Sequence, residues 1–143
     1  MLRAVLDTNI IVSGTISSSG APFEALEAWR NRKFMLVTSR PILQEVERVF
    51  EYPKIKRSYA LDPKSTKAVL AALQKYSVTT PGKRKVNKVE NDPSDNMFLA
   101  CAKEGEADFI VSGDAHLLEL KSFEGIPIMT ARGFIETIKQ RVY

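Results

Sequence analysis

Short apolar runs alternate with segments of helical periodicity along most of the chain. The apolar runs predict strands at 3–6, 34–38, 109–112 and 126–129. Helical spacing of apolar positions predicts helices at 22–32, 40–50, 63–76, 93–104 and 132–141. Strands that alternate with helices in this way form a parallel sheet with helices on both of its faces. The pattern therefore predicts an α/β fold of three layers, α/β/α, around a central parallel sheet.

Two predicted helices begin with residues that can bond free backbone N–H groups. Ser39 and Asp92 stand at N-cap positions, and Pro93 follows Asp92 at the first helical position. Asp95, three residues after Asp92, completes a capping box. We expect the segment 79–91 to be the longest loop and the most mobile part of the chain.

Length and composition limit the domain organisation. A chain of 143 residues with 44% hydrophobic composition fits one compact domain, 1–143, and we find no internal repeat or linker. An excess of 21 Lys and Arg over 17 Asp and Glu gives a net charge of +4, which permits a polyanionic partner without requiring one. Basic residues gather at 30–33, 54–57 and 83–88, either as solvated ends of helices and loops or as contacts to a phosphate backbone.

The single cysteine and the start of the chain bear on the compartment. Cys101 cannot form an internal disulfide, and its place among apolar residues predicts a packed thiol. The apolar start ends at Asp7, too early for a secretory signal, and no apolar run is long enough to span a bilayer. We therefore expect a cytoplasmic protein with no membrane contact.

Three acids stand where elements are predicted to meet. Ligands of an open parallel sheet bind beyond the carboxyl ends of its strands, and Asp7 and Asp114 each follow such an end. Each of them alone also fits a helix cap or a turn. Asp95 is open to two interpretations as well, because the first turn of a helix favours both a capping acid and a metal-bound phosphate.

The helix predicted at 40–50 adds two further acids. Glu45 and Glu47 flank its apolar stripe almost symmetrically, so helical spacing does not choose between them. Arg48 could pair with either acid, and a solvated helix edge is the alternative for both.

Several other chemistries lack the residues they need. His116 is the only histidine and Cys101 the only cysteine, so a His/Cys zinc site or a Cys-His pair has too few members. The chain also has no Gly-x-Ser-x-Gly elbow, P-loop or dinucleotide fingerprint. We expect His116 to be a surface residue in the turn after Asp114 rather than a proton carrier.

Four segments together resemble a known family. They are Val5-Leu6-Asp7-Thr8-Asn9, Ile42-Leu43-Gln44-Glu45-Val46, Asp92-Pro93-Ser94-Asp95-Asn96-Met97-Phe98-Leu99 and Ala107-Asp108-Phe109-Ile110-Val111-Ser112-Gly113-Asp114. In this order and spacing they resemble a PIN domain over nearly the whole chain. The Asp-Pro-x-Asp-Asn block is frequent in the branch described as toxin components of toxin-antitoxin pairs, which the sequence resembles most.

The resemblance implies a metal-dependent ribonuclease, with Mg²⁺ or Mn²⁺ as cofactor and RNA as substrate. It also implies that catalytic and metal-binding acids fall on Asp7, Glu45, Asp95 and Asp114, which resolves the tie with Glu47. Hard divalent cations prefer oxygen ligands, and converging carboxylates repel one another unless a cation neutralises them.

Further implications concern supporting residues and partners. Asn9 and Ser112 match polar positions that support the ligands by hydrogen bonding, Ser112 standing where threonine is commoner, and Asp92 is an additional acid of the branch and a further candidate ligand. The family implies a homodimer and often a small antitoxin protein. The basic residues that we expect to contact RNA are Lys83, Arg84, Lys85 and Lys88.

Two other functions remain open from the sequence. A haloacid-dehalogenase-like phosphatase would use Asp7 as nucleophile, but that motif needs an acid two residues later, where Asn9 stands. The other alternative is a catalytically silent module that binds RNA or a protein partner, yet such modules tend to lose the acids that this chain retains.

Overall fold

The structure is a computed structural model that describes residues 1–59, 62–86, 88 and 93–141. Its elements in chain order are β1 (Arg3–Leu6), α1 (Thr8–Ile16), α2 (Ala21–Arg30), β2 (Met35–Ser39), α3 (Arg40–Phe50), α4 (Pro53–Tyr59), α5 (Pro63–Tyr76), β3 (Val78–Thr80), η1 (Pro93–Asp95), α6 (Asn96–Glu104), β4 (Phe109–Val111), α7 (Ala115–Leu120), β5 (Ser122–Phe123), β6 (Ile126–Met129) and α8 (Ala131–Gln140).

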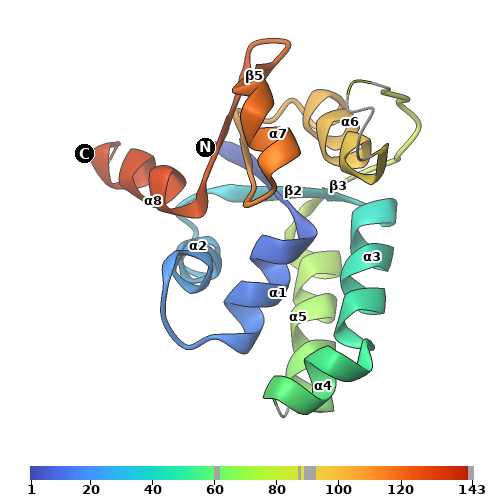
Figure 1. The fold of residues 1–143 in the computed structure, drawn as a ribbon. Coiled ribbons are helices and arrows are strands. Elements are labelled where there is room, and N and C mark those ends of the chain that lie inside the picture. Colours follow the sequence, from blue (N-terminus) through green and yellow to red (C-terminus); the bar gives the residue numbers. More distant parts are fainter. Residues whose placement is uncertain (60–61, 87, 89–92, 142–143) are drawn as a thin grey trace.

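The strands form one sheet in the order β3-β2-β1-β4-β6-β5. All neighbours are parallel except β5 and β6. Helices α1, α3 and α5 cover one face of the sheet, and α6 and α7 cover the other (Figure 1). Helix α8 lies beside α2 at one end of the sheet (Figure 1). The predicted α/β/α fold is confirmed.

The core explains why the central strands are continuous apolar runs. Ala4, Val5 and Leu6 of β1 are fully buried, because helices cover the sheet on both sides. Phe134 of α8 packs edge-to-face on Phe34 with 4.8 Å between ring centroids, which joins the last helix to the residue that precedes β2. Across the described ranges, every helix is too short or too polar to cross a membrane.

Some elements differ from those that the sequence predicts. Helix α1 was not expected, because its first five residues, 8–12, include three β-branched apolar side chains that suit a strand equally well. The short elements α4, α7, β3 and β5 were also missed. Strand β5 pairs antiparallel with β6 through a two-residue turn, in which Glu124 has a φ of 47° and Gly125 a φ of 84°. The central sheet is therefore mostly rather than wholly parallel.

The predicted loop at 79–91 begins too early. Thr79 and Thr80 belong to β3 and pair with Thr38 and Ser39 of β2. Residues 87 and 89–91 of that loop lie outside the described residues.

The helix predicted at 93–104 is divided in two. Pro93–Asp95 forms a single 3₁₀ turn, and α6 begins only at Asn96, with Asp95 at its N-cap position. Asp92 lies outside the described residues, so the predicted capping box is untested.

The close approach of α1 and α2 depends on Gly14. A Cβ atom at this position would lie 2.6 Å from the carbonyl oxygen of Pro22 and 2.7 Å from a Leu26 methyl group. We expect Gly14→Ala to lower the free energy of unfolding by about 1–3 kcal/mol through overpacking. Urea unfolding measures the change.

Gly133→Ala on α8 is the matched control for this prediction. Its nearest atom, Thr130 Oγ1, would lie 3.4 Å from the new Cβ, an ordinary contact. Since alanine is a better helix former than glycine, this variant should gain up to about 1 kcal/mol. Equal stability losses in both variants would show that the α1–α2 contact is not the cause.

Candidate metal centre

The candidate site lies at the carboxyl edge of the sheet, where β1 and β4 end side by side. Leu6 pairs with Val111 in the parallel register, and the Asp7 N–H donates to the Val111 carbonyl at 3.0 Å. The next residues of the two strands, Asp7 and Ser112, therefore leave the sheet together. This edge is where open parallel sheets place their ligands.

The carboxylate of Asp7 is buried and held by three donors. The Ile10 N–H donates to Oδ1 at 2.8 Å, which makes Asp7 the N-cap of α1. The Ser112 hydroxyl and, at 3.3 Å, the Gly113 N–H donate to Oδ2. Burial nevertheless raises the pKa of Asp7 above its ordinary value, against the effect of these hydrogen bonds, and the nearby charge of Asp114 raises it further.

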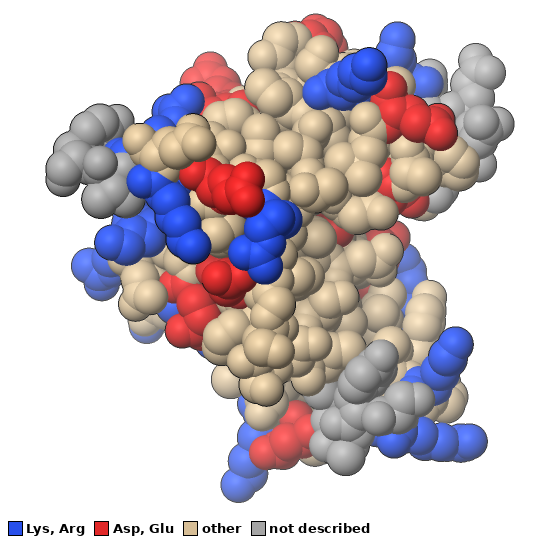
Figure 2. Space-filling model, turned by 60° about the vertical axis from the view of Figure 1, so that its left-hand side comes forward, with Lys and Arg blue, Asp and Glu red and all other residues tan. Residues whose placement is uncertain are grey.

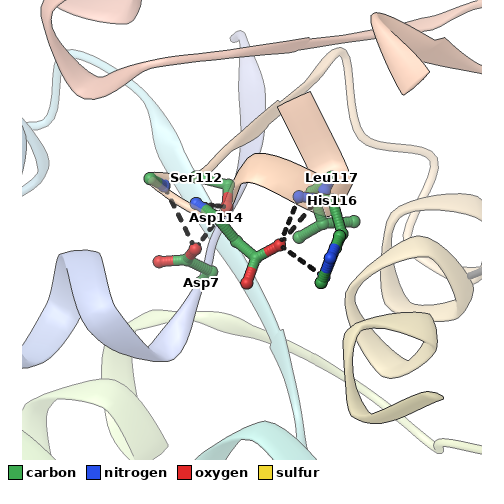
Figure 3. A network of polar contacts seen from close by, with 6 residues as sticks. Asp7, Ser112, Asp114, His116 and Leu117 are labelled. Atoms are coloured by element: carbon green, nitrogen blue, oxygen red, sulfur yellow. Dashed lines mark hydrogen bonds and ion pairs between the residues drawn. The ribbon is translucent and has the colours of Figure 1, made fainter. Parts of the chain in front are cut away.

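Ser112 joins the two acids. Its fully buried hydroxyl donates to Asp7 and accepts the Asp114 N–H at 2.9 Å. Figure 3 shows this hydroxyl between the Asp7 carboxylate and the backbone of Asp114. The serine side chain supplies the hydroxyl that this arrangement needs.

Asp114 caps helix α7 with one oxygen only. The N–H groups of His116 and Leu117 donate to Oδ1 at 2.8 and 3.2 Å. The second oxygen points away from these donors (Figure 3). The capping and metal-binding interpretations of Asp114 are therefore compatible, because each needs a different oxygen.

Asp95 approaches from the start of α6 and completes a three-residue group. Asp95, Asp114 and His116 each offer one ligand atom within 4.8 Å of the others, the only such group among the described residues. Asp95 is buried, whereas Asp114 and His116 are partly buried. Two carboxylates and an imidazole fit a divalent cation: the oxygens suit Mg²⁺ or Mn²⁺, and the nitrogen favours a transition metal.

His116 is the functional candidate that sequence reasoning missed. Its ring is 41% exposed, as a surface residue would be, yet Nδ1 is buried and lies 3.9 Å from Asp114 Oδ1. One feature of the sequence could have indicated this role: His116 stands two residues after Asp114, in the first turn of a short helix. Because the Asp114 carboxylate accepts the His116 N–H, the histidine is held next to this acid.

Glu45 and Glu47 differ in burial. Glu45 is partly buried on α3, a helix that contacts both α1 and α6, whereas Glu47 is exposed. Neither Glu45 nor Asp7 belongs to the 4.8 Å group, so their direct contact with a metal stays a prediction.

The remaining predicted site residues lie at the surface or outside the described residues. Asn9 is exposed, and so are the four basic candidates Lys83, Arg84, Lys85 and Lys88. Arg84 approaches Glu124 at 3.9 Å. On the face that Figure 2 shows, Lys and Arg are interspersed with Asp and Glu rather than joined in one basic patch. Asp92 cannot be placed, because it lies outside the described residues.

Comparisons with known proteins cover most of the chain. A family model described as a PIN domain matches residues 3–116. Uncharacterized protein MJ1680 of Methanocaldococcus jannaschii is 31% identical over 120 residues, which cover 84% of this chain and 76% of that protein. A chain in the crystal structure of VapBC2 from Rickettsia felis, bound to a DNA fragment from their promoter, superposes with a TM-score of 0.57 at 13% identity. That match covers 90% of this chain and 98% of the other.

The raised pKa of Asp7 predicts how the metal-free protein responds to pH. The folded state favours the protonated form of Asp7. The free energy of unfolding therefore falls as the pH rises from about 3.8, the ordinary pKa of the carboxyl group in the unfolded chain, through the higher pKa of the folded protein. Asp7→Asn removes this charge. We expect a melting temperature above wild type at neutral pH in EDTA, with the difference shrinking as pH falls toward 4.

Asp62→Asn at the exposed N-cap of α5 is the control, since asparagine caps a helix about as well as aspartate. It should leave the melting temperature nearly unchanged at neutral pH. An Asp7→Asn variant that melts below wild type at every pH would show that the hydrogen bonds outweigh the buried charge.

Proposed function

Because the chain belongs to the PIN-domain family, we propose that it is a divalent-metal-dependent endoribonuclease that hydrolyses RNA phosphodiester bonds. The observation that carries the proposal is the convergence of Asp95, Asp114 and His116 beside the buried Asp7. These groups come from three separate chain segments and meet at the ligand-binding edge of a parallel sheet. Such a concentration of negative charge is costly in the absence of a cation.

Each residue has a distinct part in this proposal. Asp95, Asp114 and His116 would each supply one ligand atom to the cation. Asp7 and Glu45 supply further negative charge, and Ser112 keeps Asp7 and Asp114 in fixed orientation. A bound Mg²⁺ or Mn²⁺ would activate a water and offset the charge that develops on the phosphoryl oxygens. Cleavage then leaves a 5′-phosphate and a 3′-hydroxyl.

The proposed function also includes protein partners. The VapBC2 complex contains a chain of similar fold, which supports the proposal that this protein is the toxin component of a toxin-antitoxin pair. A small antitoxin protein and a second copy of this chain are the partners that we propose. The cytoplasmic location, the contact of Asn9 with the ligands and the RNA contacts of Lys83, Arg84, Lys85 and Lys88 stay predictions from the sequence.

The two alternative functions are less well supported. A phosphatase of the haloacid-dehalogenase type would need an acid two residues after a nucleophilic Asp7, and Asn9 stands there instead. A silent binding module would not need to keep Asp7, Asp95 and Asp114 buried or partly buried at one edge. Metal-dependent cleavage of RNA by the purified chain separates the three functions.

Chelation is the direct test of the proposal. EDTA should abolish cleavage of a single-stranded RNA by the full chain, and Mg²⁺ or Mn²⁺ should restore it. Asp114→Asn, measured beside the wild type, excludes a contaminating nuclease. Its loss of activity should exceed the roughly 10- to 100-fold typical of residues that only orient a ligand. Cleavage that persists in EDTA would contradict the proposed site.

The two acids of α3 give a matched pair of variants. Glu45→Gln should lower the cleavage rate by about tenfold or more, since a partly buried carboxylate near the cation would be neutralised. Glu47→Gln changes an exposed side chain two residues away and should leave the rate near wild type. Single-turnover rates at saturating Mg²⁺ measure both. The reverse result would mean that the glutamate of the family's helix corresponds to Glu47 rather than to Glu45.

A further inference from the structure

The carboxyl edge of the sheet continues beyond the acids. The registers of β4 with β1, of β1 with β2 and of β2 with β3 place the ends of the four strands side by side. Neighbouring strands lie about 4.8 Å apart, so the edge is a row of closely spaced positions. The row consists of Ser112, Asp7, Ser39 and Thr80. Its first half belongs to the candidate metal centre, and its second half carries only hydroxyl groups.

A cavity of about 190 Å³ lies over that second half. It adjoins the metal centre, because Asn96 lines it and follows Asp95 directly in the chain. Three buried lining residues carry hydroxyl or amide groups, namely Ser39, Thr80 and Asn96. Three partly exposed ones are apolar, namely Val86, Met97 and Ala100.

One side of the cavity is the segment after β3, which is hydrogen-bonded to Glu104 of α6. The Glu104 carboxylate accepts the N–H groups of Gly82 at 2.8 Å and Lys83 at 3.1 Å. Desolvation raises the pKa of Glu104, but these and further hydrogen bonds outweigh it and leave the pKa below its ordinary value. The segment is thus tied to α6 rather than free in solvent. It presents Arg84 and Lys85, which also line the cavity and are exposed.

We propose that this cavity binds the nucleobase of the nucleotide next to the scissile phosphate of a single-stranded RNA, and so sets a base preference for cleavage. The proposal rests on the proposed function for the adjoining metal centre. In this proposal the hydroxyl groups of Ser39 and Thr80 and the amide group of Asn96 form hydrogen bonds with the polar edge of the base. Arg84 and Lys85 contact the phosphate that follows.

The chemistry of the lining selects a base over a phosphate alone. A base has two apolar faces and a polar edge, and unpaired RNA bases are commonly turned into protein pockets that read that edge. The apolar side chains of Val86, Met97 and Ala100 match the faces, whereas a bare phosphate would use none of them. The exposed Arg84 and Lys85 suit the phosphate backbone of the RNA, because a phosphate is attracted by positive charge and does not need a pocket of matching shape.

A binding experiment tests the cavity without requiring catalysis. Nucleoside 5′-monophosphates and ribose 5-phosphate are titrated into the full chain in EDTA, with the Met97 methyl and Asn96 amide NMR signals as probes. At least one nucleotide should bind about tenfold more tightly than ribose 5-phosphate, a difference of about 1.4 kcal/mol. If no nucleotide binds better than ribose 5-phosphate, the proposal is overturned, whether or not the protein cleaves RNA.

Ala100→Leu fills the cavity and should remove the tenfold preference. Ala72→Leu is the matched control, because Ala72 is also partly exposed on a helix but lines a different cavity, between α2 and α5. It should bind nucleotides as the wild type does. Thr80→Val keeps the shape of the side chain and removes one hydroxyl, so it tests the same cavity if Ala100→Leu does not fold. It should alter which base binds best.

Cleavage of a randomised single-stranded RNA in Mg²⁺ provides the second readout. The wild type should prefer one base at a single position beside the cleaved bond, and Ala100→Leu should flatten that preference while Mn²⁺ binding stays unchanged. Cleavage without any such preference, or one that Ala100→Leu leaves intact, overturns the cavity proposal. Absence of metal-dependent cleavage by the wild type overturns the proposed function instead, and the binding experiment still decides the cavity.

Discussion

Asp7 brings a negative charge to a place where little water can solvate it, and the surrounding structure is arranged around that charge. Asp7 is 3% exposed and directly follows the fully buried residues Ala4, Val5 and Leu6 of β1. The N-terminus of α1, the Ser112 hydroxyl and the Gly113 N–H all direct donors at it. Because Ser112 also accepts the Asp114 N–H, the orientation of the second acid depends on the first. Removing Ser112 would leave a buried carboxylate short of a donor and would free the start of α7.

Helix starts make this concentration of acids tolerable. Asp7 caps α1, Asp114 caps α7, and Asp95 stands at the N-cap position of α6. Free N–H groups at a helix start carry partial positive charge and favour carboxylates. Capping also fixes which oxygen of Asp114 is used by the fold and which is left for a ligand. The structural and chemical interpretations that compete in the sequence are thus parts of one arrangement.

The sequence predicts those parts of the fold and site that depend on local pattern. The helices α3 and α5 begin and end as predicted, since an N-cap or proline starts each one and a clear apolar stripe runs along it. The buried Cys101 was likewise expected, and its burial raises the pKa of the thiol to about 12, which makes it a poor nucleophile. Because Asp7 and Asp114 follow two of the predicted strands, the sequence alone predicts that both acids lie at one edge of the sheet.

What could not be predicted depends on contacts between distant segments. The pattern of α1 does not distinguish a buried helix from a strand, and only packing against α2 and α3 decides it. The approach of His116 to Asp95 requires that α6 and α7 meet over the same sheet face, which no spacing in the chain reveals. Glu45 is separated from Glu47 by burial against neighbouring helices, again a tertiary effect. One side of the cavity beside Asn96 is the segment after β3, whose hydrogen bonds to Glu104 of α6 are likewise a contact between distant parts of the chain.

The distribution of charge bears on how a polyanion reaches the proposed site. The chain carries a net charge of +4, yet the edge of the sheet holds Asp7, Asp95 and Asp114. An uncompensated cluster of this kind repels a phosphate at close range, where screening by salt is weakest. The exposed Arg84 and Lys85 stand beside the neutral half of the edge, so attraction there can act before the acids are neutralised. A cation bound by the acids would change the acidic half of the edge from repulsive to attractive for a phosphate, and it would thereby couple close approach of the phosphate to the presence of the metal.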